Sequence, residues 1–245
     1  MSGHSKWANI QHRKKAQDAK RGKLFTRLIR EIVVAAKAGG SDLDANAALR
    51  IAVDKGKSQS VPKDAIERAV KRGAGELDDS NYEEIRYEGY GPAGIAIIVD
   101  CLSDNRNRTV AEVRHAFAKS GGNLGQTGSV AYMFSNQGVL IYSPEQDEDI
   151  IIEAAIEAGA EDVIIADDGS IEVLTTAEEY MQVKQAMIDL GLEPEESDLT
   201  MRASTNTQLN VDDGAQLVRL IDMLESFDDV QEVYYNAEIP AQAYE

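Results

Sequence analysis

The sequence predicts an α+β protein built from an N-terminal helical bundle and two α+β domains, one of them ferredoxin-like and inserted in the other. Two observations predict this. Apolar residues recur at helical spacing as far as residue 75, whereas short apolar runs alternate with helical segments after it. The charge also changes sign there: residues 1–75 carry 17 Lys and Arg against 7 Asp and Glu, and residues 76–245 carry 8 against 36.

The basic segment is expected to form a bundle, domain 1–75. In its best-defined helix, Leu24, Leu28 and Ile32 recur every four residues, and Gly39-Gly40 ends the stripe. Short helices with one apolar stripe each have to pack on one another. The helices are expected at residues 9–21, 23–38, 46–57 and from Val61-Pro62 to Gly73.

After a linker at Ala74–Asn81, the pattern predicts two further domains. Strands at 82–88, 95–102 and 129–134 with a helix at 105–120 form the first part of one domain, and a helix at 212–226 with a strand at 230–235 completes it. That domain is therefore expected at 82–134 plus 207–245. Between its parts, residues 135–206 follow the ferredoxin-like β-α-β-β-α-β order: strands 138–142, 163–166, 170–174 and 195–203, helices 147–158 and 177–190.

Several classes of protein are disfavoured by what the sequence lacks. Cys101 is the single cysteine, which suits a reducing compartment, and the polar, basic N-terminus has no apolar core of a secretory signal. Apolar runs are too short for a membrane helix, so we expect a cytoplasmic protein with no membrane partner. No metal-ligand spacing, phosphate loop or dinucleotide fingerprint is present. We therefore expect no enzyme, no cofactor and no metal.

One group of chemically reactive residues, Asp100, Cys101, Asp104 and His115, lies close together in the sequence. Cys101 ends an apolar strand, where a buried and inert thiol is the usual outcome. This group is therefore not expected to be catalytic. Because carboxylates are abundant, a metal-dependent nuclease remains the contrasting enzyme hypothesis.

The basic N-terminal segment is the candidate nucleic-acid contact. Rows of Lys and Arg match a linear polyanion, because each neutralised phosphate releases condensed counterions. Lys23, Arg27 and Arg30 share one helix face beside the apolar stripe. An ordinary solvated helix face is the alternative, and charge does not distinguish DNA from RNA. The candidate residues are Lys6, Trp7, Arg13, Lys14, Lys15, Lys20, Arg21, Lys23, Arg27 and Arg30.

Trp7, the only tryptophan, has two readings. It can stack on a base or wedge against the backbone of a nucleic acid, or it can anchor the N-terminal arm to the bundle. His4 and His12 are either phosphate contacts or merely exposed.

A possible secondary contact lies at Arg106, Arg108 and Arg114, which belong to a helix whose N-terminal amides can attract an anion. The alternative is that Asn105 or Asn107 caps this helix and that the arginines pair with nearby carboxylates. The glycine-rich segment that follows, residues 121–128, lacks the lysine of a phosphate loop. It predicts a flexible or tightly turned loop that can contact a large partner.

The acidic domain, residues 135–206, carries 18 acidic and 2 basic residues and should repel nucleic acid. It either binds a protein partner or mimics nucleic acid, or it serves solubility.

Three long stretches resemble the YebC/PmpR family: GHSKWANIQHRKKAQDAKRGKLFTRLIREI (Gly3–Ile32), YEGYGPAGIAIIVDCLSDNRNRTVAEVRHAF (Tyr87–Phe117) and GGNLGQTGSVAYMF (Gly121–Phe134). The resemblance runs over the full chain and implies one helical and two α+β domains. It also implies a function in gene expression: bacterial relatives are described as probable DNA-binding transcriptional regulators, a mitochondrial relative is a translational activator, and some members are regarded as ribosome-associated. The family offers no catalytic residues to carry over.

The leading hypothesis is therefore a non-enzymatic nucleic-acid-binding regulator, a DNA-binding transcriptional regulator of the YebC/PmpR type. A ribosome-associated translation factor that binds rRNA or mRNA is the alternative. No recognition helix with a base-reading face is evident, which physically favours backbone-dominated binding to RNA or to DNA of weak specificity.

Overall fold

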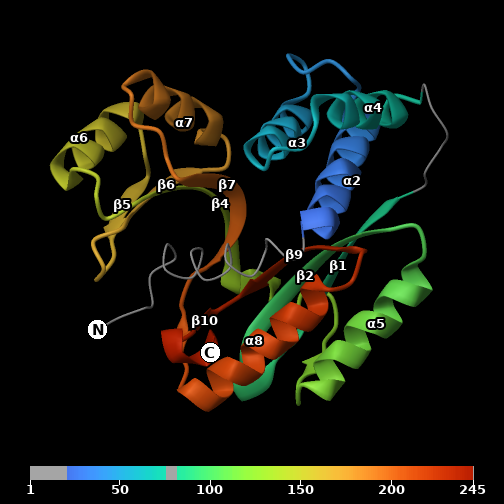
Figure 1. Ribbon diagram of the computed structural model, residues 1–245. Coiled ribbons are helices and arrows are strands. Elements are labelled where there is room, and N and C mark those ends of the chain that lie inside the picture. Colours follow the sequence, from blue (N-terminus) through green and yellow to red (C-terminus); the bar gives the residue numbers. More distant parts are fainter. Residues whose placement is uncertain (1–20, 76–81, 245) are drawn as a thin grey trace.

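The computed structural model describes residues 21–75 and 82–244, in which helices and antiparallel sheets combine into an α+β fold (Figure 1). The chain first forms a helical unit, then a four-stranded sheet, then a second four-stranded sheet, and it returns to the first sheet at its C-terminal end. Among the described residues, no helix is both long and apolar enough to cross a membrane.

The helical unit consists of α2 (Arg21–Gly39), α3 (Ala47–Ser58) and α4 (Lys63–Gly73). The predicted stripe is its core: Leu28 and Ile32 of α2 are buried against Leu49 of α3 and Ile66 of α4. These helices confirm the bundle, although the helix expected at residues 9–21 lies outside the described residues except for Arg21.

Two local features fix how these helices meet. Asn46 caps α3, because its side-chain oxygen accepts a hydrogen bond from the backbone amide of Leu49. The side-chain NH2 group of Asn46 donates to Ala35 O and Gly40 O at the end of α2. Gly73 allows α4 to approach α2, because a Cβ there would lie 2.3 Å from Val33 O. The bundle is therefore a fixed platform for the charged side chains that it carries.

The first sheet is antiparallel, with the strand order β3-β1-β2-β9, and helices α5 and α8 cover one of its faces (Figure 1). Ile97 and Val99 of the central strand pack there against Phe117 of α5 and Leu220 of α8. Strand β9 reaches this sheet from the C-terminal end of the chain. The elements are β1 (Glu83–Tyr90), β2 (Ala96–Ser103), α5 (Arg106–Lys119), β3 (Asn123–Leu124), α8 (Val211–Glu225) and β9 (Val230–Tyr235).

The strand predicted at 129–134 is wrong. Residues 131–133 form the short 3-10 helix η3 (Ala131–Met133), and only Phe134 belongs to a strand, β4. The alternation of Val130 and Phe134 with polar residues suggested a strand. Both side chains are buried against Ala96 and Ile98 of β2, so a tight turn between two apolar anchors produces the same pattern.

The second sheet has the order β5-β6-β4-β7 with all neighbours antiparallel, which is the ferredoxin-like arrangement of its β-α-β-β-α-β chain. Helices α6 and α7 cover one face of this sheet (Figure 1). The elements are β4 (Phe134–Tyr142), α6 (Glu148–Ala158), β5 (Asp162–Ile165), β6 (Ile171–Thr176), α7 (Tyr180–Asp189) and β7 (Glu196–Ala203).

The ferredoxin-like unit is inserted in the first one, as predicted. Its first and last residues are neighbours, since Phe134 of β4 pairs with Ala203 of β7. The chain can therefore leave the first sheet and return beside its point of exit. It then continues through β8 (Thr207–Gln208), α8, β9, β10 (Ala237–Glu238) and the 3-10 helix η4 (Ala241–Tyr244), with β8 and β10 paired in parallel.

Candidate nucleic-acid interface

The structure describes only part of the predicted basic contact surface. Lys6, Trp7, Arg13, Lys14, Lys15 and Lys20, together with His4 and His12, lie outside the described residues. Arg21 and Lys23 are placed in the first turn of α2, without a described side chain. Arg27 and Arg30 are the two predicted contacts whose side chains can be followed.

Arg27 and Arg30 turn toward the body of the protein. Arg27 Nη2 donates a hydrogen bond to Glu225 O at the end of α8. Arg30 Nη1 donates to Asp228 O and lies 3.1 Å from Asp229 Oδ1, with only 16% of the Arg30 side chain exposed. These two arginines hold α2 against the turn between α8 and β9. We therefore leave them out of the proposed interface.

Asp229 is the centre of this contact. Its side chain is 2% exposed, and its Oδ2 accepts hydrogen bonds from Ser103 Oγ at 3.0 Å, Thr109 Oγ1 at 2.8 Å and Arg108 Nη2 at 2.6 Å. Burial alone would raise the pKa of Asp229, but the bonds from Arg108, Thr109 and Ser103 lower it below its ordinary value. Asp229 is therefore a charged carboxylate held between cations of α2 and α5.

The same contact decides the role of Arg108, one of the three predicted secondary contacts. Arg108 pairs with Asp229 and, at 2.9 Å, with Asp104, while Asn105 caps α5 by accepting from the Arg108 amide. This is the arrangement of the structural alternative. Arg106 and Arg114 are exposed and make no ion pair with a described residue, so the prediction of a secondary contact stays open for them.

A second charged contact joins the helical unit to both sheets. Lys55 Nζ of α3 lies 2.9 Å from Asp198 Oδ2 of β7 and 2.8 Å from Glu232 Oε1 of β9. Burial lowers the pKa of Lys55, but Glu232 and Asp198 raise it well above its ordinary value overall. Burial also raises the pKa of Glu31 nearby, against the effect of Lys55. Lys55 is therefore a fixed cation at the junction of all three units.

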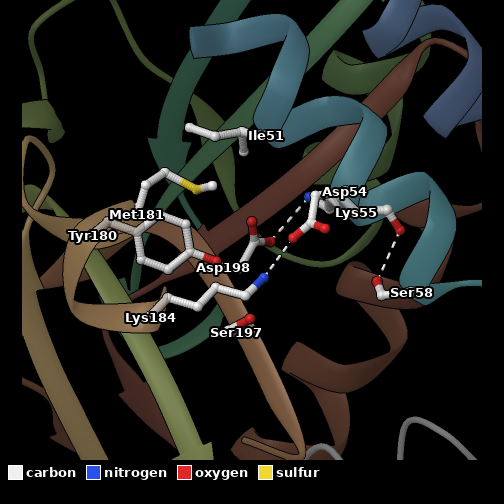
Figure 2. Close-up of a pocket in the computed structure, with 9 residues that line it drawn as sticks. All are labelled: Ile51, Asp54, Lys55, Ser58, Tyr180, Met181, Lys184, Ser197 and Asp198. Carbon is white, nitrogen blue, oxygen red and sulfur yellow. Dashed lines mark hydrogen bonds and ion pairs between the residues drawn. The ribbon is translucent and has the colours of Figure 1, made fainter. Parts of the chain in front are cut away.

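A pocket at this junction is lined by residues of α3, α7 and β7 (Figure 2). Lys184 of α7 points across it to Asp54 of α3, with Nζ 2.5 Å from Oδ2. The free volume, ≈ 10 Å³, has room for about one water molecule. The pocket is a seam of ion pairs between units, too small for an organic ligand.

Sequence reasoning missed these junction residues. Asp229 is more than a hundred positions away from its partners Arg30 and Arg108, and Lys55 is equally far from Asp198 and Glu232. No local spacing reports such pairs. The residues next to a lysine in the sequence do not show whether it binds a phosphate of a nucleic acid or a carboxylate of another unit of the same chain.

The cations that do face solvent lie elsewhere on the helical unit. Lys57 ends α3, and Lys71 and Arg72 end α4; all three are exposed and make no ion pair with a described residue. Cations are favoured at helix C-termini, so their positions also have a structural reason. Two other exposed cations of the unit, Lys63 and Arg68, are paired locally with Glu67 and Asp64.

Two members of the group near residue 100, Asp100 and Cys101, have surroundings that the structure describes. Asp100 accepts two hydrogen bonds from Arg86, both at 2.7 Å. Cys101 is buried, and its burial raises the pKa of its thiol to about 12, so that the nucleophilic thiolate is scarce. Among residues 21–75 and 82–244, no cluster of three or more His, Cys, Asp or Glu side chains has the geometry of a metal site.

Comparison with known proteins places the whole chain. Residues 5–76 match the family model described as "TACO1/YebC protein N-terminal domain", and residues 82–237 match "TACO1/YebC second and third domain". A relative from Thioalkalivibrio sulfidiphilus is 62% identical over 98% of this chain and 96% of its own. A relative from Hahella chejuensis is 58% identical over 100% and 98%. Both are named as probable transcriptional regulatory proteins.

The fold has a counterpart among solved structures. A crystal structure of a conserved hypothetical protein from Aquifex aeolicus is similar, with a TM-score of 0.81 and 43% sequence identity over 91% of this chain and 92% of that one. Sequence and fold therefore agree that this chain belongs to the TACO1/YebC family.

Proposed function

We propose that this protein is a non-enzymatic regulator of gene expression that binds nucleic acid through its basic N-terminal segment, with DNA as the first target to test. The segregation of charge is the observation that supports this most. Residues 1–75 carry a net charge of +10 and residues 76–245 a net charge of −28. Such a chain attracts a polyanion at one end and repels it along the rest.

The charge at the junction sharpens this proposal. Arg30 and Lys55 are neutralised by carboxylates of the body, so they are not available to phosphates. The cations left for binding are those of residues 6–23 and the exposed ends of α3 and α4. We expect phosphate contacts at Lys6, Arg13, Lys14, Lys15, Lys20, Arg21 and Lys23, with Lys57, Lys71 and Arg72 at the edge.

The ion pairs of the junction also give the helical unit a fixed orientation. It is held at Asp229 on one side and at Asp198 and Glu232 on the other. The described part of the helical unit, α2 to α4, would therefore meet a bound nucleic acid in one orientation. The ferredoxin-like unit, residues 135–206, carries a net charge of −16, which repels phosphates and promotes solubility.

The identity of the nucleic acid is a separate question. The names of the relatives favour DNA. The described helical unit presents cations at helix ends and no row of amide and guanidinium groups suited to reading base edges, which favours contacts with the sugar-phosphate backbone. A ribosome-associated translation factor that binds rRNA or mRNA is the second candidate.

The first experiment identifies the bound nucleic acid. Crosslinking in cells, followed by sequencing and combined with ribosome sedimentation, should recover defined DNA sites if the protein acts on promoters. Enrichment of rRNA without DNA sites would instead select the translation hypothesis. Recovery of neither would contradict the proposed function.

The second experiment counts the phosphate contacts. Lys14, Lys15, Lys20 and Arg21 are each changed to Ala, and affinity is measured across a range of salt concentrations. Each lost contact should reduce the slope of log K against log[salt] by about 0.7–0.9. Arg219→Ala removes an exposed cation from the acidic body and is the matched control. Slopes equal to that of the control would remove these residues from the interface.

A nuclease assay tests the contrasting enzyme hypothesis. Incubation of the protein with nucleic acid and Mg²⁺ should produce no hydrolysis of the nucleic acid.

A further inference from the structure

The glycine-rich loop between α5 and β4 is built to be rigid. A Cβ at Gly122 would lie 2.3 Å from Tyr90 O, and a Cβ at Gly125 would lie 2.6 Å from Ser129 Oγ. Gly121 and Gly128 have positive φ angles of 76° and 84°, which favour glycine. Of the two alternatives that the sequence left open, a flexible or a tightly turned loop, the structure has the tightly turned one.

A buried carboxylate fastens the end of this loop. Glu88, which is 3% exposed, accepts hydrogen bonds from the amides of Gly128 at 2.7 Å, Val130 at 2.9 Å and Ala131 at 2.8 Å. Burial alone would raise the pKa of Glu88, but the three amide bonds lower it below its ordinary value. The charged carboxylate and three donors thus fix the backbone immediately before residue 132.

Tyr132 is the residue that this anchor presents. Its side chain is 76% exposed, although Val130 and Phe134 on either side are buried against the first sheet. A single exposed aromatic ring is ordinary on a protein surface. An exposed ring on a backbone fixed by a buried carboxylate is less ordinary, since a rigid aromatic side chain is an efficient platform for stacking.

The surroundings of Tyr132 are open to phosphates. No Asp or Glu occurs between Glu112 and Glu145, in a body that otherwise carries a large excess of acid. The exposed residues near Tyr132 in the sequence are polar and uncharged: Gln126, Thr127, Ser135 and Asn136. The loop's own sequence therefore adds no carboxylate that would repel a polyanion.

The loop also lies on the same side of the first sheet as the helical unit. Glu88 pairs with Ile98, and Ile98 with Tyr234, so these three side chains share one face. Glu232, two residues from Tyr234, points to that face as well and contacts Lys55 of α3. The turn that carries Tyr132 and the contact of the helical unit at Lys55 are therefore on the same side of this sheet.

We propose that Tyr132 stacks on an unpaired base of a single-stranded nucleic acid whose phosphates are held by the basic helical unit. This inference rests on the proposed function and deepens it by naming the substrate class. In a duplex the bases already stack on one another, so an exposed ring on a fixed turn finds no free base face. Single-stranded segments and loops of RNA offer such faces.

The test uses the full chain with Tyr132→Ala and Tyr132→Trp, and it measures binding of a single-stranded RNA and of the duplex of the same sequence. Tyr132→Ala should weaken single-strand binding by roughly 5- to 100-fold and leave duplex binding unchanged. The slope of log K against log[salt] should not change, because the ring carries no charge. Tyr132→Trp should retain or strengthen single-strand binding.

The controls separate this inference from the proposed function. Ile156→Ala removes a side chain that is 68% exposed on the acidic unit and should have no effect on binding. If Tyr132→Ala binds single strands as tightly as wild type does, while the lysine variants bind them more weakly, the stacking role is overturned. Tyr132 would then be an exposed ring suited to contact with a protein. If neither set of variants alters affinity, the proposed function itself fails.

Discussion

Lys55 and Lys57 stand two residues apart in the same helix, yet they have opposite surroundings. Lys55 is held between carboxylates of two sheets, whereas Lys57 is exposed without an ion-pair partner among the described residues. The helical unit therefore has an inward face, whose cations attach it to the acidic body, and an outward face, whose cations remain available. The lysines of one helix thus divide into a cation that anchors the helix and a cation that faces solvent, according to the direction in which each side chain points.

In most ion pairs of the inward face, the helical unit supplies the cation and the body supplies the anion. Arg30 and Lys55 are the cations, and Asp229, Asp198 and Glu232 are the carboxylates. The exception is the reversed pair in which Lys184 of the acidic unit meets Asp54 of α3. The body's negative charge thus does more than repel phosphates: it also positions the basic unit. Variants of the two faces should separate loss of stability from loss of binding.

The largest effect is expected for Asp229→Asn. This change removes the anion that Arg30 and Arg108 share. The single amide oxygen of Asn also cannot accept on both sides, from Arg30 and from the donors Ser103, Thr109 and Arg108. We expect the free energy of unfolding to fall by about 3 kcal/mol, measured by urea denaturation. Asp104→Asn, which removes the exposed partner of the same Arg108, should cost less than about 1 kcal/mol. Equal losses for both variants would contradict a buried anchor at Asp229.

The comparison of the two faces is tested directly by Lys55→Met and Lys57→Met. Lys55→Met leaves Asp198 and Glu232 without their cation, but both are partly exposed, so we expect a loss of about 1–2 kcal/mol. Lys57→Met should change stability by less than about 0.5 kcal/mol. Under the proposed function the order reverses in nucleic-acid binding, since Lys55 is already paired with carboxylates whereas Lys57 is exposed. Matching effects of the two variants in both assays would remove the distinction between the faces.

The dependence of stability on pH differs between the two anchoring carboxylates. The pKa of Asp229 is lowered in the folded protein, so its contribution is present above its unfolded pKa and is lost as pH falls through the folded pKa. Burial raises the pKa of Asp198, so protonation there favours the folded state as pH falls. The difference in unfolding free energy between wild type and Asp229→Asn should therefore narrow only below about pH 4, the ordinary pKa of an aspartate, as urea titrations in that range can show. For Asp198→Asn no narrowing of this kind is expected.

Local patterns were enough to predict the α+β class, the helical bundle and the ferredoxin-like insertion. The stripe of Leu28 and Ile32 and the period change after the linker are both consequences of short-range geometry. The prediction of a strand at 129–134 was wrong, because two buried apolar residues in a tight turn give the same alternation of apolar and polar residues as a strand. What holds the turn is Glu88, some forty residues earlier in the chain.

For the candidate site, too, the sequence predicted the local pattern but not the partners of each residue. The charge asymmetry was readable, but the roles of Arg27 and Arg30 depend on the turn between α8 and β9, which is nearly two hundred residues away. A helix face that looks suited to phosphates also suits carboxylates and carbonyl oxygens of another unit. Only the assembled fold shows which of the two it meets.

The smallest effect on stability is expected on the outward face, at Lys71 and Arg72. Changing both to Ala should alter the free energy of unfolding by less than about 0.5 kcal/mol, because both side chains are exposed and lack ion-pair partners among the described residues. If both touch phosphates, the slope of log K against log[salt] should fall by about 0.7–0.9 for each. Arg219→Ala, on the acidic body, should leave the slope unchanged. A slope that survives the double change would remove Lys71 and Arg72 from the interface, and these two cations would then serve only to balance the dipole of α4.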